Sequence, residues 1–422
     1  MGSLSGMHSC PPLRLLVILV LLCILIPAGQ AVAPLWTIPA TPGETLSTVA
    51  IAHNGSIIIA GGDQLIAISP AGQKLWAGWA GAPLDISDDG GYIVAAQGQI
   101  VQLISGQGIL LWQQSLGNTV TALSISPDAG IIVAGGETYV QSWFNSGSGM
   151  GKNTTETVQD IRISPEKDQI LVCTAQALRS FNLTYVPNWY DTSVSPSAVA
   201  ISGDGTGIVA VNGNHVRMYH GGGTLLWDRA FPGGNIISLA YSRDGSTIVT
   251  GRDDGTVLAI GRDGSLLWSG KAGFWVTSVA VSDDGSTIVT GSIDNQIFVF
   301  DRQGTPLGGA ITKNPVKSRS VAVSGDGSLI VVVDSSEVYG FSRDQFTAPA
   351  NQSATTPVSA EQGNTTEWQA PGNTTIITTL PSGAVPILPN ASGPAPAASP
   401  APGFSWILVP VALAVLVLAK NR

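Results

Sequence analysis

The sequence predicts an all-β protein that folds as an eight-bladed β-propeller with four antiparallel strands in each blade. Three observations support this fold class. A strand and turn pattern recurs about every 40 residues, each copy holds four strand-sized segments, and one extra segment near the N-terminus completes the last copy. The pattern is clearest in residues 276–308, where alternating strands flank an Asp-Gly turn at Asp284-Gly285.

The pattern occurs eight times between residues 34 and 344. The first turn of each copy falls at Asn54, Asp89, Asp128, Glu166, Asp204, Asp244, Asp284 and Asp326. Successive turns lie 35, 39, 38, 38, 40, 40 and 42 residues apart. Each interval accommodates four strands of about five residues with their turns, so each copy is expected to form one blade.

The last copy ends after its third strand, at residues 341–344. Upstream of the first copy, residues 34–37 read as a fourth strand that has no blade of its own. We expect this N-terminal strand to pair with residues 338–341, because ring closure leaves no sheet edge unpaired.

Most copies end with a tryptophan in the fourth strand. These residues are Trp36, Trp76, Trp112, Trp189, Trp227 and Trp268. The pattern resembles the tryptophan-docking repeat of quinoprotein (PQQ-dependent) dehydrogenases, which are eight-bladed, and of their non-catalytic scaffold relatives. The first three strands also resemble WD-repeats, with Asp254 or Asp294 in the second turn and Phe300-Asp301 closing the third strand. The tryptophan is replaced by Met150 or Gly151 in the third copy and by Leu307 in the seventh.

The resemblance implies two different functions, and the residues favour the non-catalytic one. Quinoprotein dehydrogenases are expected to carry an adjacent Cys-Cys pair, an Asp base and calcium ligands, but this chain has no Cys-Cys and its copies lack long insertions. Its four histidines show no metal-ligand spacing. We therefore predict no catalytic residue, metal or cofactor. The alternative is a PQQ-dependent oxidoreductase-like protein with its cofactor in the axial channel.

Composition argues against nucleic acid as a partner. The chain has 19 Lys and Arg against 28 Asp and Glu, a net charge of −9, and charged residues make up only 11%. Leaving out Arg14, Lys420 and Arg422 of the terminal segments gives 16 against 28, or −12. A phosphate-binding surface needs clustered basic residues, and none occurs.

The N-terminus reads as a signal peptide over residues 1–31. Arg14 precedes the apolar run 15–26, and small residues lead to a cleavage site after Ala31, although an uncleaved anchor is the alternative. Cys10 and Cys23 lie in this segment, so the exported chain keeps only Cys173 and no intrachain disulfide. We expect Cys173 to act as a buried small hydrophobe and not as a reactive thiol.

Residues 345–402 are rich in Ala, Pro, Thr, Ser and Asn and read as a glycosylated stalk. Asn-x-Ser/Thr acceptors occur at Asn351, Asn364, Asn373 and Asn390 in this segment and at Asn54, Asn153 and Asn182 in the propeller. Pro402, Gly403 and Phe404 then open a short apolar segment with a basic end, residues 403–422. This arrangement resembles the archaeal PGF-type sorting signal, which implies removal of the tail and attachment to a lipid. An ordinary C-terminal membrane helix is the alternative.

The innermost strands have a bulky face, such as Val279/Val281, and a small face, such as Ser278/Ala280, so adjacent blades can pack bulky on small. Blades two and four instead place Asp85, Asp160 and Arg162 on the small face. We expect either a structural ion pair or a ligand contact that lines the channel.

Alternating strand direction predicts two faces. The Asp-Gly turns and the Gly turns before Trp share a stereotyped face, from which the stalk leaves. The opposite, variable face carries the residues that we predict to bind a partner. These residues are Trp79, Phe231, Arg252, Asp253, Phe274, Trp275, Asp294, Lys317 and Arg319. Exposed aromatics among charges are typical of recognition surfaces, although aromatics that cap the core are the alternative.

Together these features predict a non-enzymatic protein on the extracellular face of the cell membrane or envelope. It would be anchored by its C-terminal segment or a lipid and would bind an envelope protein or glycan.

Overall fold

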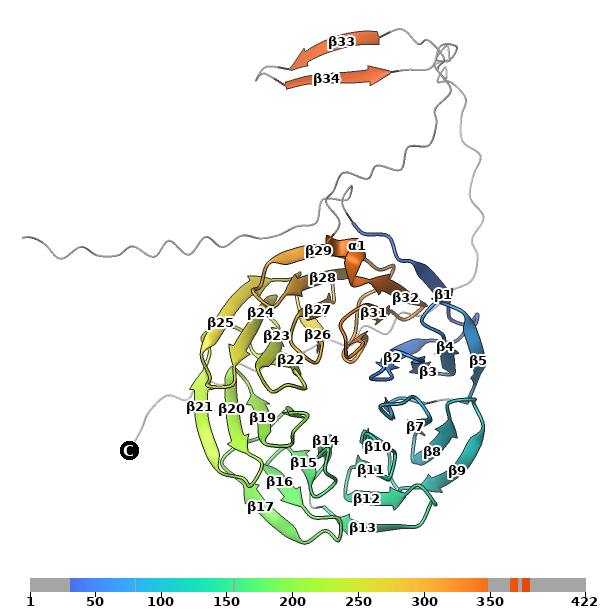
Figure 1. Cartoon of the computed structure of the whole chain (residues 1–422), viewed down its shortest axis with the longest axis vertical. Coiled ribbons are helices and arrows are strands. Elements are labelled where there is room, and N and C mark those ends of the chain that lie inside the picture. The colour runs from blue at the N-terminus through green and yellow to red at the C-terminus, as the bar shows by residue number, and fades with distance from the viewer. Residues whose placement is uncertain (1–30, 80, 155, 348–364, 371–373, 380–422) are drawn as a thin grey trace, which may run out of the picture. The chain divides into compact units, whose positions relative to one another are not determined.

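A computed structural model describes residues 31–79, 81–154, 156–347, 365–370 and 374–379. The chain divides into two units, residues 1–353 and 354–422. In the first unit, eight four-stranded antiparallel sheets stand as blades around a central channel (Figure 1). This arrangement confirms the predicted eight-bladed β-propeller.

Blades 1 to 4 follow one another along the chain, each with its innermost strand first. Blade 1 comprises β2 (Leu46–Ile51), β3 (Ile58–Gly62), β4 (Leu65–Ile68) and β5 (Lys74–Gly78). Blade 2 comprises β6 (Leu84–Ile86), β7 (Tyr92–Gln97), β8 (Ile100–Ser105) and β9 (Leu110–Ser115). Blade 3 comprises β10 (Val120–Ile125), β11 (Ile131–Gly136), β12 (Tyr139–Phe144) and β13 (Gly149–Asn153). Blade 4 comprises β14 (Val158–Ile163), β15 (Ile170–Thr174), β16 (Ala177–Phe181) and β17 (Pro187–Asp191).

Blades 5 to 7 continue this order, and blade 8 takes its outermost strand from the N-terminus. Blade 5 comprises β18 (Ala198–Ile201), β19 (Gly207–Asn212), β20 (His215–His220) and β21 (Leu225–Ala230). Blade 6 comprises β22 (Ile236–Tyr241), β23 (Thr247–Arg252), β24 (Thr256–Gly261) and β25 (Leu266–Lys271). Blade 7 comprises β26 (Val276–Val281), β27 (Thr287–Ser292), β28 (Gln296–Asp301) and β29 (Pro306–Ile311). Blade 8 comprises β30 (Val321–Val323), β31 (Leu329–Val333), β32 (Glu337–Ser342) and β1 (Trp36–Pro39).

The ring closes as the sequence predicts. Strand β1 pairs antiparallel with β32, with Trp36 opposite Gly340 and Ile38 opposite Val338. A short helix, α1 (Arg343–Thr347), follows β32, and its Phe346 is 3% exposed. At the other end, the Val32 N–H donates to the Gly309 carbonyl at 2.8 Å. The packed domain therefore extends two residues beyond the predicted boundaries at 34 and 344, because both flanks add buried contacts.

The core is divided among the blade interfaces. Ala240 of blade 6 packs against the cluster that contains Val279 of blade 7, and Ala280 of blade 7 packs against the cluster that contains Val321 of blade 8. These contacts confirm that the bulky face of one blade meets the small face of its neighbour. Because both faces of the inner strands are covered, the inner strands read as apolar throughout.

The Asp-Gly turns of the stereotyped face are held by a repeated hydrogen-bond pattern. In blade 7, Ser282 Oγ donates to Asp284 Oδ1 at 2.8 Å, and the Ser286 N–H donates to the same oxygen at 2.8 Å. Gly285 supplies the positive φ of 73° that the turn requires. The carboxylate thus accepts hydrogen bonds from within its own turn. Among the described residues, no group of three or more His, Cys, Asp or Glu is placed to hold a metal ion.

The docking tryptophans link neighbouring blades on the outside of the ring. Each indole Nε1 donates to a backbone carbonyl in the Gly turn of the next blade, at 2.8 Å for Trp76 to Gly106 and 2.9 Å for Trp227 to Arg262. The same bond occurs for Trp36, Trp112, Trp189 and Trp268. The indole lies over the turn glycine: a Cβ on Gly223 would fall 2.3 Å from Trp189.

Two joints lack the tryptophan, and each has a structural reason. Blade 8 has no turn before its outermost strand, because that strand comes from the N-terminus, and Phe346 of α1 lies beside Gly308 of blade 7 instead. At the joint of blades 3 and 4, the Lys152 ammonium lies 4.8 Å from the centre of the Phe181 ring. Without an indole over it, the turn tolerates Tyr185 at a φ of 59°.

The second unit contains one described element, a hairpin of β33 (Thr365–Ala370) and β34 (Thr374–Thr379) within the predicted stalk. Within the described parts of the chain, no helix is both long and apolar enough to cross a membrane. Several predicted features lie outside the described residues: the signal peptide up to residue 30, the sorting residues Pro402, Gly403 and Phe404, and the glycosylation acceptors Asn351, Asn364, Asn373 and Asn390.

Candidate functional site: the axial channel and the variable face

The innermost strands line an axial channel whose wider part, about 740 Å³, opens toward the variable face. At one level of this wall, five blades contribute a small residue: Ala50, Ala200, Ala240, Ala280 and Ala322. The same position is Asp85 in blade 2, Ser124 in blade 3 and Arg162 in blade 4. One side of the channel is therefore charged, and the other is left open by small side chains.

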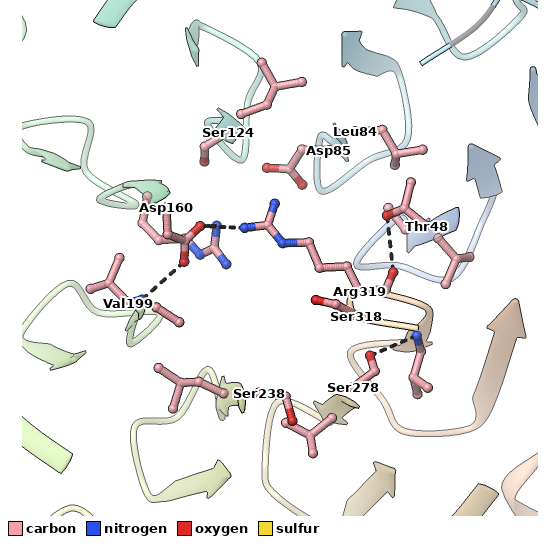
Figure 2. Close-up of a pocket in the computed structure, with 18 of the residues that line it drawn as sticks. Thr48, Leu84, Asp85, Ser124, Asp160, Val199, Ser238, Ser278, Ser318 and Arg319 are labelled. Carbon is pink, nitrogen blue, oxygen red and sulfur yellow. Dashed lines mark hydrogen bonds and ion pairs between the residues drawn. The ribbon is translucent and has the colours of Figure 1, made fainter. Parts of the chain in front are cut away.

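Asp160 is the centre of the charged side. This carboxylate is 2% exposed, and its Oδ1 accepts hydrogen bonds from Arg162 Nη1 at 3.0 Å and Arg319 Nη2 at 2.8 Å. The backbone N–H groups of Ile161 and Val199 also donate to it. Figure 2 shows Arg319 extending across the channel from blade 8 to Asp160 in blade 4. The predicted ion pair of Asp160 and Arg162 is confirmed, and it also lines the channel.

Asp85 faces the same space without a cationic partner. Its carboxylate oxygens accept the backbone N–H groups of Ile86 at 2.9 Å and Ile125 at 3.1 Å, and among the described residues no Lys, Arg or His nitrogen lies within 4 Å of it. Burial raises the pKa of Asp85, while these N–H groups and the charges of Arg162 and Arg319 oppose the rise. The ionised form of Asp85 is thus poorly compensated.

The opposite end of the channel is crossed by two ion pairs. Arg243 of blade 6 reaches Asp88 of blade 2 at 2.8 Å, and His53 of blade 1 lies 3.0 Å from Asp283 of blade 7. Burial raises the pKa of Asp283, against the lowering effect of His53 and Arg243. These four residues occupy the same repeat position, directly before the first-turn residue. They were not predicted from the sequence, although aligning the eight copies at that position would have revealed them.

Backbone hydrogen bonds join these positions from blade to blade. The Asp283 N–H donates to Gly325 O, and the Gly325 N–H donates to His53 O, both at 3.0 Å. The Asp88 N–H donates to Pro127 O at 2.9 Å. The stereotyped end of the channel is therefore narrowed and held by structural contacts.

On the variable face, Phe274 and Trp275 form an exposed aromatic pair. Phe274 is 64% exposed and Trp275 is 43% exposed, and their rings stack with centroids 6.0 Å apart and an interplanar angle of 6°. The Trp275 carbonyl accepts the N–H of Ile293, another exposed apolar residue that the sequence analysis did not select. Lys317 and Asp294 are exposed as well.

The other predicted partner-binding residues have contacts within the ring. Arg252 is 2% exposed, which removes it from the binding surface, because its guanidinium binds the carbonyls of Phe231 and Pro232. Phe231 packs partly against the core. Asp253 accepts the Asn235 N–H at 2.7 Å, and the indole N–H of Trp79 donates to Gly108 at 3.2 Å. Arg319 lines the axial channel and binds Asp160 there.

The described glycosylation acceptors differ in their surroundings. Asn54 and Asn153 are exposed, whereas Asn182 is partly buried and its Oδ1 accepts the N–H groups of Thr184 and Val186. Cys173 is fully buried, and burial raises the pKa of its thiol. This placement agrees with its predicted role as a small hydrophobe.

Comparison with known proteins supports the repeat type. Residues 229–258 and 264–301 match the family described as WD domain, G-beta repeat. No curated protein matches this sequence. These two stretches of the β-propeller therefore match WD40-type repeats, and the resemblance to PQQ-dependent repeats has no separate support.

Solved structures show the same fold at low sequence identity. The C-terminal WD40 domain of Sif2 is 14% identical, with a TM-score of 0.62, and the alignment covers 74% of this chain and 98% of that one. The computationally designed Ika8 protein is 18% identical, with a TM-score of 0.60 and coverage of 74% and 99%. Chaetomium thermophilum Sqt1 bound to the N-terminus of the ribosomal protein L10 is 14% identical, with a TM-score of 0.61 and coverage of 71% and 97%.

Proposed function

We propose that this protein is a non-enzymatic scaffold of the cell envelope that binds an envelope protein or glycan through its variable face. The observation that carries the proposal is the exposed stacked pair of Phe274 and Trp275. Propellers with WD40 repeats are typically protein-binding scaffolds and are generally non-catalytic. Aromatic side chains held rigidly at a surface contribute much of the energy at binding interfaces.

The geometry of the pair favours a partner over a cap on the core. Ring stacking fixes both side chains against each other, so little conformational entropy is lost when a partner covers them. The neighbouring Ile293 is 38% exposed and extends the apolar surface, while Lys317 and Asp294 supply charges beside it. An apolar centre with a polar rim is the usual anatomy of an interface.

Export and anchoring are part of the proposal. Val32, the first residue after the proposed signal peptide, packs against the interface of blades 7 and 8, which favours cleavage before it. The chain leaves the ring at the stereotyped face, where the Arg343 N–H donates to Ser328 O at 2.9 Å. A stalk over residues 345–402 and a sorting signal over 403–422 would then hold the variable face away from the membrane.

The test is affinity capture from the organism's own envelope extract. The immobilised native protein is compared with a Phe274→Ala/Trp275→Ala variant, and with Leu266→Ala/Leu267→Ala as the matched control. The control removes two exposed apolar side chains of β25, 50% and 47% exposed. We expect one component captured by the native protein and the control but lost from the aromatic variant. Equal capture by all three proteins would contradict the proposal.

Mass spectrometry of the same native protein tests the processing. We expect Val32 as the first residue and no peptide beyond Phe404, with a lipid on the new C-terminus. An intact Lys420-Asn421-Arg422 end would exclude the sorting signal.

A further inference from the structure

The wide part of the channel has the volume and the mixed lining of a small-molecule site. Its volume of about 740 Å³ lies within the range of roughly 300–1,000 Å³ that is typical of ligand pockets. Bulky apolar residues such as Leu123, Leu239 and Val279 share its wall with the charged cluster. It opens on the variable face, whereas the far end is crossed by Arg243–Asp88 and His53–Asp283. A ligand would therefore enter beside Arg319.

The charges in this cavity are unevenly matched. Two guanidinium groups, of Arg162 and Arg319, converge on the single oxygen Oδ1 of Asp160. The second carboxylate, Asp85, is held only by two backbone N–H groups. Figure 2 shows Asp85 and Asp160 facing the same space, with the end of Arg319 beside them. The cavity thus offers free guanidinium N–H groups at one place and, at another, a carboxylate that no cationic side chain contacts directly.

The unused hydrogen-bonding groups define the complementary chemistry. Within the described part of the chain, Nε and Nη1 of Arg319 and Nε and Nη2 of Arg162 have no hydrogen-bond partner. A guanidinium edge with free N–H groups fits a carboxylate in a two-point contact. A carboxylate that is partly removed from water and has no direct cationic contact is stabilised by an incoming ammonium group, which places an opposite charge against it.

We propose that the axial channel binds a small zwitterion with one ammonium and one carboxylate group, such as a free amino acid with an apolar side chain. The ammonium is bound by Asp85, and the carboxylate by the free edges of Arg319 and Arg162. The apolar side chain lies along the wall formed by Leu123, Leu239 and Val279. The net charge of the cluster is zero when all four groups are ionised, and a zwitterion keeps it at zero. This site is independent of partner binding at Phe274 and Trp275.

Calorimetric titration of the purified exported protein tests the proposal with three zwitterions. Glycine is the smallest, γ-aminobutyrate has a longer spacer between its charged groups, and L-leucine has an apolar side chain. Each zwitterion is compared with its N-acetyl form, which lacks the ammonium, and with its amide, which lacks the carboxylate. We expect at least one zwitterion to bind, about tenfold more tightly than its two blocked counterparts. Absence of binding by all three zwitterions up to about 10 mM, or equal binding of the blocked forms, would overturn the proposal.

Three variants assign the two ends of the ligand. Asp85→Asn should remove the preference over the N-acetyl form, and Arg319→Gln should remove the preference over the amide. Lys313→Gln, on the same face but outside the cavity lining, should leave the affinity unchanged. If Asp85→Asn folds normally and retains the preference for a free ammonium group, Asp85 does not bind it and the site is wrongly assigned.

Discussion

The two ends of the axial channel are built from the same repeat but serve different purposes. At the stereotyped end, charged side chains are paired across the ring and the backbone is linked from blade to blade. At the variable end, Phe274 and Trp275 are exposed and Arg162 and Arg319 keep free donors. Residues whose polar groups are paired with one another stabilise the ring, and residues with free donors or exposed apolar area are the ones that we propose bind other molecules.

The largest effect is expected at Asp160, whose buried carboxylate accepts hydrogen bonds from two guanidinium groups and two backbone N–H groups. Asp160→Ala would leave two guanidinium groups and the buried N–H groups of Ile161 and Val199 without their acceptor. We expect the free energy of unfolding, measured with denaturant, to fall by about 3–5 kcal/mol.

The matched control for this variant is Arg319→Ala. The Arg319 side chain is 40% exposed, so its ion pair contributes less than about 1 kcal/mol. A similar loss of stability in both variants would show that Arg319 at the channel entrance contributes as much to the free energy of unfolding as Asp160 does.

The second effect concerns the Gly turns on the stereotyped face. Gly223 and Gly147 both have positive φ, of 89° and 83°, but a Cβ would lie 2.3 Å from Trp189 at Gly223 and 3.4 Å from Trp112 at Gly147. Gly147→Ala should cost about 1 kcal/mol from backbone strain alone. Gly223→Ala should cost about 2–3 kcal/mol, because the added carbon also displaces the indole. Equal losses in thermal or denaturant unfolding would argue against a structural role for tryptophan docking.

The fold could be predicted from the sequence because each blade depends on short-range signals. The Asp-Gly turns, the alternating strands and the terminal tryptophans recur at a fixed period, and Trp36 was the one such signal without a blade. The two joints without tryptophan were visible in the sequence, but their causes were not. The roles of Tyr185, which stands in the Gly position, and of Phe346, which stands in place of an indole, depend on contacts between neighbouring blades.

The candidate site was less predictable because its contacts cross the ring. Asp160 and Arg162 lie two residues apart in one strand, so their pairing followed from the sequence. Arg319 and Asp160 are 159 residues apart, and no local pattern indicates that a loop side chain spans the channel. Arg252 was assigned to the surface from its loop position, but the loop folds over it and its guanidinium binds two carbonyls. Loop length and loop direction, which the repeat does not specify, decide such placements.

The division between a structural face and a binding face is tested most directly by the stability of Phe274→Ala/Trp275→Ala. The two residues are exposed and stack mainly on each other, so removing them should change the free energy of unfolding by less than about 0.5 kcal/mol. The melting temperature should then stay within about two degrees of the native value, well above that of Gly223→Ala. If the double variant instead loses as much stability as Gly223→Ala, these aromatics belong to the core and the variable face is not the binding face.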